Sequence, residues 1–257
     1  MTEIFDTHAH YDDEAFDEDR DELLAGLPAQ GIARVVNVGA TLSSCESTIA
    51  LMEKYNYIYG AIGVHPSEVA ELDEDHFAWL KEQCLREKCV AVGEIGLDYH
   101  WPDPEPALQR EWFVRQLNLA REIGKPVVIH SRDAAKDTID IMQAEKADET
   151  GGVIHCYAYS VESAKIFLNM GYYFGIGGVL TFKNARKLKE AVEYIPLDRM
   201  VLETDCPYLA PEPNRGKRNS SLNLPYVVSA MAQIKGISEE EVRKAMWENA
   251  HALYRMK

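Results

Sequence analysis

Residues 107–130 read ALQREWFVRQLNLAREIGKPVVIH and contain a helix, a helix stop and a strand in succession. The apolar residues of the first part lie three and four apart, which predicts an amphipathic helix over residues 107–123. Gly124, with Pro126 behind it, is a typical helix end, and the apolar run Val127-Val128-Ile129 follows. A strand without polar alternation is typical of a parallel sheet that is covered on both faces.

The same strand and helix pattern recurs along the whole chain. The eight expected strands lie at residues 4–6, 34–39, 57–64, 89–96, 126–130, 152–157, 172–179 and 200–205. Eight strands in a chain of 257 residues that is 46% hydrophobic predict an α/β fold, a (β/α)8 TIM barrel forming one domain over residues 1–257. A doubly wound open sheet is the alternative, because periodicity does not show closure. A capping box, Ser238 with Glu241, predicts a last helix that ends near Tyr254.

Composition narrows the range of functions. The net charge of −15 disfavours a tight electrostatic grip on duplex DNA. Eight acidic residues between Asp12 and Glu22 predict the solvated start of a helix. Five scattered cysteines, without a signal peptide or a long apolar segment, predict a cytoplasmic protein with free thiols and no membrane span.

Polar residues stand where five of the expected strands end. In a parallel barrel these ends form one rim, so side chains far apart in sequence meet there. Burying several titratable groups together is costly unless they are paired or bind metal, so the set predicts a metal centre. Its members are His8, His10, Glu94, His130, His155 and Asp205.

These residues, in this order, resemble the TatD family of metal-dependent deoxyribonucleases within the amidohydrolase-like barrels. The resemblance covers nearly the whole chain. It is carried by residues 6–10 (DTHAH), 63–66 (GVHP), 93–99 (GEIGLDY), 126–132 (PVVIHSR), 155–157 (HCY) and 203–208 (ETDCPY).

The resemblance implies two divalent ions per chain, of Zn, Mg, Mn or Fe. The first would be bound by His8, His10, Glu94 and Asp205, and Glu94 would bridge to a second ion held by His130 and His155. The sequence departs from the family at two places. Tyr159 stands where the family usually has a flexible glycine, and the loop over residues 215–221 lacks a Glu-Pro pair, with Ser220 and Ser221 in its place.

Such a centre predicts a hydrolase that attacks phosphodiester bonds with a metal-activated water. Asp205, which would orient the water and accept its proton, and the bridging Glu94 are the expected catalytic residues. A TatD-like exonuclease acting on ends of single-stranded DNA or of other nucleic acids is the leading function. Two alternatives stay open: an amidohydrolase or esterase acting on a small molecule, and a non-catalytic metal-binding interaction protein. Cys156 and Cys206 flank expected ligands, but packing as small apolar groups is the simpler interpretation.

Substrate contacts are expected from residues near the same rim, and the sequence leaves the oligomeric state open. The candidates are His65, Asp98, Tyr99, Arg132, Arg215, Lys217 and Arg218. The cations among them suit binding of a phosphate.

Overall fold

The computed structural model of the protein describes residues 3–256. Its eight strands are all parallel and lie side by side in chain order. They are β1 (Ile4–Ala9), β2 (Ile32–Val38), β3 (Ile58–Ile62), β4 (Cys89–Asp98), β5 (Val127–Arg132), β6 (Gly152–Ile154), β7 (Tyr173–Ile176) and β8 (Met200–Leu202).

The ring of strands closes between β1 and the segment that follows β8. Ala9 pairs with Cys206 in a parallel bridge. The His10 N–H donates to the Cys206 carbonyl at 2.8 Å, and the Asp205 N–H donates to the His8 carbonyl at 3.0 Å. Closure confirms the predicted TIM barrel and excludes the open doubly wound sheet.

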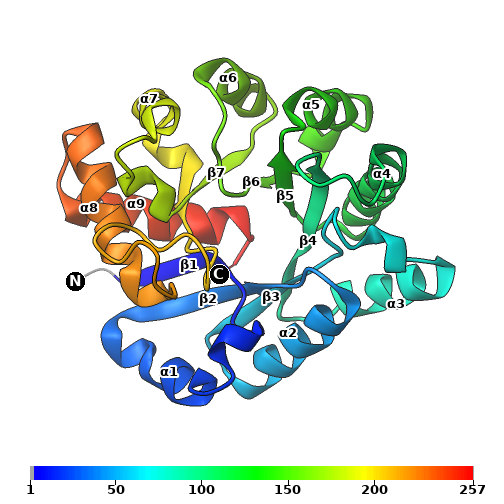
Figure 1. The fold of residues 1–257 in the computed structure, drawn as a ribbon, viewed down its shortest axis with the longest axis horizontal. Helices are drawn as coiled ribbons and strands as arrows, with labels where there is room; N and C mark the ends of the chain where they lie inside the picture. Colours follow the sequence, from blue (N-terminus) through cyan, green and yellow to red (C-terminus); the bar gives the residue numbers. More distant parts are fainter. Residues whose placement is uncertain (1–2, 257) are drawn as a thin grey trace.

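Helices surround the ring on its outside, except the last one, which packs across one end of the barrel (Figure 1). They are α1 (Arg20–Gly26), α2 (Leu42–Lys54), α3 (Glu74–Cys84), α4 (Pro106–Ile123), α5 (Ala135–Ala144), α6 (Val161–Asn169), α7 (Arg186–Tyr194), α8 (Leu224–Lys235) and α9 (Glu239–Leu253). Short 3-10 helices join them: η1 (Glu14–Phe16), η2 (Pro28–Gln30), η3 (Val69–Glu71), η4 (Ala147–Glu149), η5 (Gly178–Thr181), η6 (Leu197–Arg199) and η7 (Ser221–Asn223). No helix within residues 3–256 has the length and apolar character needed to span a membrane.

The core has two parts, one between the strands and the outer helices and one inside the barrel. Inside, side chains from the strands, such as Phe5, Val128 and Val201, pack against α9. The Phe5 ring contacts Trp247 and Tyr254 of this last segment. Since α9 covers the amino-terminal end of the barrel, the carboxyl-terminal rim is the end that is left for a site.

Local signals explain the element boundaries. The α4 helix ends at Gly124, whose left-handed φ of 68° suits glycine. The predicted capping box of Ser238 and Glu241 is present at the start of α9. The acidic segment from Asp12 to Glu22 holds η1 and the first turn of α1, as the charge pattern predicts.

Candidate metal centre

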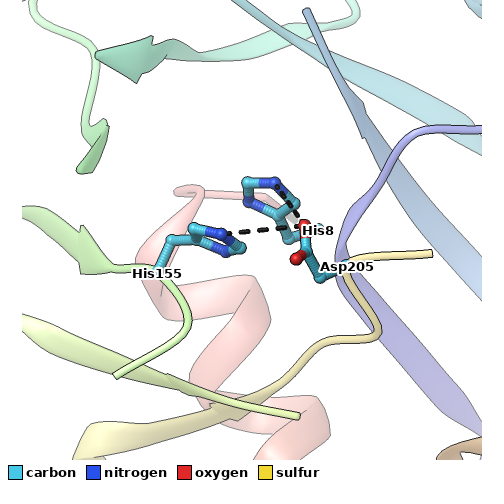
Figure 2. Close-up of side chains that lie close together, drawn as sticks. All are labelled: His8, His155 and Asp205. Atoms are coloured by element: carbon cyan, nitrogen blue, oxygen red, sulfur yellow. Dashed lines mark ion pairs between the residues drawn. The ribbon is translucent and has the colours of Figure 1, made fainter. Parts of the chain in front are cut away.

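Four imidazoles and two carboxylates from β1, β4, β5 and the segments after β1, β6 and β8 meet at the carboxyl-terminal rim. Glu94 is central: its Oε2 lies 3.3 Å from His8 Nε2, and its Oε1 lies 2.8 Å from His130 Nδ1 and 3.6 Å from His155 Nε2. Asp205 Oδ1 lies 3.7 Å from the Nε2 atoms of both His8 and His155 (Figure 2). His10 Nε2 lies 3.4 Å from the same oxygen.

The outer nitrogen of three imidazoles faces an oxygen that only accepts hydrogen bonds. His10 Nδ1 donates to the Val38 carbonyl at 2.8 Å. His130 Nε2 faces Asp98 Oδ2 at 3.1 Å, and His155 Nδ1 faces Glu203 Oε2 at 3.3 Å. In the neutral rings of His10 and His155 the proton therefore lies on the outer nitrogen, and the lone pair of the other nitrogen faces the centre. His130 has a carboxylate oxygen at each nitrogen, Asp98 Oδ2 at Nε2 and Glu94 Oε1 at Nδ1, and is held between the two.

Glu203 is a site residue that the sequence interpretation missed. Its carboxylate is 1% exposed, and besides His155 it accepts the Cys156 N–H at 2.6 Å. Gly175 makes room for it, because a Cβ there would lie 2.0 Å from Glu203 Oε2. The residue stands two positions before Asp205 in a matched motif, but nothing in its spacing indicates that it faces His155.

The carboxylates make the centre attractive to positive charge. Burial lowers the pKa of His10, but the hydrogen bond and charge of Asp205 outweigh this and raise the pKa to about 9. Burial likewise opposes a raised pKa at His155, yet the charges of Glu203 and Glu94 raise that pKa to about 10. For Glu94, burial is outweighed by His155 and His8, so its pKa lies well below the usual value.

This arrangement fits divalent metal ions. The inward nitrogens of His8 and His10 are only 3.0 Å apart, and the His10 atom is an acceptor in the tautomer that the Val38 carbonyl requires. A divalent cation can bind both of these nitrogens at once, whereas a proton between them is bonded to only one of them. Imidazole and carboxylate together suit Zn, Mn and Fe, and the mixed donor set does not distinguish among them.

Four groups of side chains within residues 3–256 have the spacing that metal ligation requires, and two of them overlap at Glu94. One of these two is His8, His10 and Glu94, and the other is Glu94, His130 and His155. Glu94 belongs to both, as expected of a bridging carboxylate. The remaining two groups are His8, His155 and Asp205, which places Asp205 beside the centre, and His65, Asp98 and His130.

Three of the predicted substrate contacts, His65, Asp98 and Arg132, lie near the centre. His65 Nε2 lies 3.8 Å from Glu94 Oε1, and Asp98 contacts His130. Tyr99 is directed to the other side, where its hydroxyl donates to Asp137 at 2.8 Å. Arg132 follows His130 on β5 and is exposed, and its guanidinium has no hydrogen-bond or ion-pair partner within residues 3–256.

The cations of the loop after β8 lie farther from the metal-binding groups. Arg218 forms two hydrogen bonds with the Asp19 carboxylate, at 2.7 and 2.6 Å. Arg215 lies over the Phe182 ring and 3.9 Å from Glu212. Lys217 lines a separate hollow together with four acidic residues of the 13–18 segment. Their role in substrate binding remains a prediction.

Both departures from the family pattern have a structural role. The Tyr159 hydroxyl lies 2.9 Å from Ser131 Oγ, which ties the ring to the end of β5. Ser221 donates its hydroxyl to Asp6 Oδ2 at 2.6 Å, so the altered loop is bound directly to β1.

Burial raises the pKa of the Cys156 and Cys206 thiols, which disfavours nucleophilic thiolates at both positions.

A closed parallel barrel with inward histidines and carboxylates at its carboxyl-terminal rim is the architecture of a metal-dependent hydrolase. Comparison with known proteins makes the class specific. The sequence matches the family described as TatD related DNase over residues 5–255, so the chain belongs to this family and is a metal-dependent hydrolase of the TatD type.

Relatives cover nearly the whole chain. It is 42% identical over 253 residues to the uncharacterized metal-dependent hydrolase YabD of Bacillus subtilis, covering 98% of this chain and 99% of that protein. It is 32% identical over 239 residues to the 3'-5' ssDNA/RNA exonuclease TatD of Cronobacter sakazakii, covering 91% and 90%. The crystal structure of YJJV, a TatD homolog from Escherichia coli, superposes with a TM-score of 0.92 at 28% identity, covering 99% and 98% of the two chains.

Proposed function

We propose that the protein is a two-metal nuclease that removes nucleotides from the ends of single-stranded nucleic acid. The observation that carries this proposal is the central position of Glu94, with Oε2 toward His8 and Oε1 toward His130 and His155. In this assignment the first ion is held by His8, His10, Glu94 and Asp205, and the second by Glu94, His130 and His155.

Bound divalent ions supply Lewis-acid stabilisation of charge on a phosphoryl oxygen and lower the pKa of water near neutrality. Asp205 is the general base. Burial raises its pKa, but the hydrogen bond from His10 and the charge of His155 outweigh this, so the pKa is lowered and the side chain is a carboxylate. Its Oδ1 faces the histidines, and its Oδ2 has no hydrogen-bond partner within residues 3–256. We assign to Oδ2 the orientation of the attacking water and acceptance of its proton.

Nucleic acid ends are the substrate that the surroundings favour. A hollow of about 340 Å³ lies over the centre and leaves space for a small part of a polymer. Asp12 and Asp13 line it and disfavour the many phosphate contacts of a bound duplex. The relative from Cronobacter sakazakii carries the name of a single-strand exonuclease, which supports the same substrate class.

The test is hydrolysis by protein that has been stripped of metal and reconstituted separately with Mn, Mg, Zn and Fe. Substrates are single-stranded DNA and RNA labelled at either end, and a panel of small esters and amides. We expect stepwise shortening of a labelled strand, and its loss in Asp205→Asn. Turnover of an ester or amide with no shortening of any strand would support the small-molecule amidohydrolase instead.

A further inference from the structure

Two hollows meet at the metal centre and differ in character. The first, of about 340 Å³, is bordered by Asp12, Asp13 and Ser44 in addition to metal-binding groups. The second, of about 490 Å³, extends past β5, β6 and η5. The two share the imidazoles of His130 and His155, and Tyr208 stands between them as a common wall.

Charge separates the two hollows. Outside the metal-binding groups, the first hollow carries two carboxylates and no cation. In the second, Asp205 is the only acidic residue among the lining residues, and Arg132 adds a guanidinium that no acidic residue within 3–256 neutralises. A phosphate that leaves the centre therefore meets repulsion on one side and an available cation on the other.

The walls of the second hollow are largely apolar. Ala158, Val179 and Leu209 line it together with the ring of Tyr208. Both Tyr208 and Leu209 have large side chains with apolar surface, yet Tyr208 is 55% exposed and Leu209 is 37% exposed. The Tyr208 hydroxyl donates to Asp13 Oδ2 at 2.8 Å, which holds the ring in place at the boundary.

The geometry points to a nucleoside subsite: we propose that the hollow of Ala158, Val179, Tyr208 and Leu209 binds the base and sugar of the terminal nucleotide, with Arg132 on the adjoining phosphate. This inference rests on the proposed nuclease function and names its specificity site. Aromatic faces bind bases of every sequence by stacking, so recognition there is of a nucleoside in general. The volume lies in the range of about 300–1,000 Å³ that is usual for small-ligand sites.

The test compares three chromogenic phosphodiesters with the same leaving group. They are methyl p-nitrophenyl phosphate and the two thymidine p-nitrophenyl phosphates esterified at the 5' or the 3' oxygen. In the metal-loaded wild type, we expect kcat/KM for the better thymidine ester to exceed that for the methyl ester by at least about tenfold. Hydrolysis of the methyl ester reports the metal centre without the subsite.

Leu209→Asn removes the apolar wall while keeping a residue that tolerates the left-handed backbone of this position, where φ is 53°. We expect the thymidine preference to fall to about threefold or less through a higher KM, with the methyl ester unaffected. Leu85→Asn, an equally drastic change at a 61% exposed leucine outside this hollow, is the control and keeps the preference. If Leu209→Asn does not fold, Val179→Ser tests the same wall.

Equal kcat/KM values for the methyl and thymidine esters in the wild type would overturn the subsite and leave the proposed nuclease standing. An undiminished preference in folded Leu209→Asn would also overturn it. Absence of metal-dependent hydrolysis for all three esters and for single-stranded DNA would overturn both the subsite and the proposed function.

Discussion

Three of the four proposed ligand histidines, His10, His130 and His155, are held by oxygens behind their rings. Val38, Asp98 and Glu203 each place an acceptor against the outer nitrogen of one ring. Such contacts hold the ring plane, so we expect them to affect metal affinity without touching a bound ion. Of the two carboxylates, Glu203 is the more deeply buried, with 1% of its side chain exposed.

Glu203→Gln is expected to weaken the ion bound by His155 by about 10–100-fold, since an amide is a poorer partner for an N–H than a carboxylate is. Gly175→Ala is expected to act in the same direction, because the new Cβ would collide with the Glu203 carboxylate. Metal affinities are measured by competition with a chelator, and the exposed Glu190→Gln is the control. Unchanged affinity in both variants would remove Glu203 from the site.

The meeting of His8, Glu94 and Asp205 at one rim could be predicted, because each stands at or near the end of a strand in a parallel barrel. The residues that contact the outer nitrogens of the histidines could not be predicted from the sequence. Glu203 lies inside a matched motif, but only the fold reveals that it faces His155 across the gap left by Gly175. Asp98 was predicted as a substrate contact, and its observed partner is the His130 ring.

A buried carboxylate, Asp6, links the first strand to the segment after the last strand where the sheet closes. Asp6 Oδ1 accepts the Thr204 N–H at 3.1 Å, and its Oδ2 accepts the hydroxyls of Thr204 and Ser221 at 2.7 and 2.6 Å. The same carboxylate accepts the His8 N–H at 3.3 Å. Asp6 therefore links β1, the segment after β8 and the loop that follows, and so positions His8 relative to Asp205.

Asp6→Ala is expected to lower the free energy of unfolding by about 1–3 kcal/mol, because the buried Thr204 N–H loses its side-chain acceptor. Chemical denaturation of the metal-free protein measures the change. Asp148→Ala, an exposed aspartate in η4, is expected to change it by about 0.5 kcal/mol or less. Equal stability of the two variants would contradict the role of Asp6 in closure.

The existence and order of the elements could be predicted, and their lengths less well. The expected strand over residues 4–6 continues to Ala9, whereas the expected strand over residues 200–205 ends at Leu202. An extended strand through residue 205 is incompatible with the left-handed φ of 57° at Asp205, which apolar periodicity does not report.

The charge of the whole chain and the acidic residues at the rim both disfavour a long polyanion as substrate. A net charge of −15 leaves few phosphate contacts for a long polyanion. The acidic segment that contains Asp12 and Asp13 also borders the metal centre. The number of strands predicts a closed barrel, but the apolar periodicity alone fits an open sheet equally well. The bridge between Ala9 and Cys206 decides between the two folds.

Closed circular single-stranded DNA is expected to resist the enzyme under conditions that shorten the linear strand of the same sequence. Binding of duplex DNA is expected to be weak, and its dependence on salt shallow, because few counterions are released. Gel analysis of both substrates and titrations at several salt concentrations measure these properties. Efficient cutting of the circles would contradict action on ends.

Anomalous scattering from crystals soaked in Mn or Zn decides whether Glu94 bridges two ions. We expect two peaks in the wild type, loss of both in Glu94→Ala, and retention of the peak beside His8 and His10 in His155→Ala. A parallel metal analysis of His8→Ala with His10→Ala checks that the protein in solution loses metal as well. Equal loss of both peaks in Glu94→Ala and His155→Ala, or two undiminished peaks in Glu94→Ala, would contradict the bridged centre.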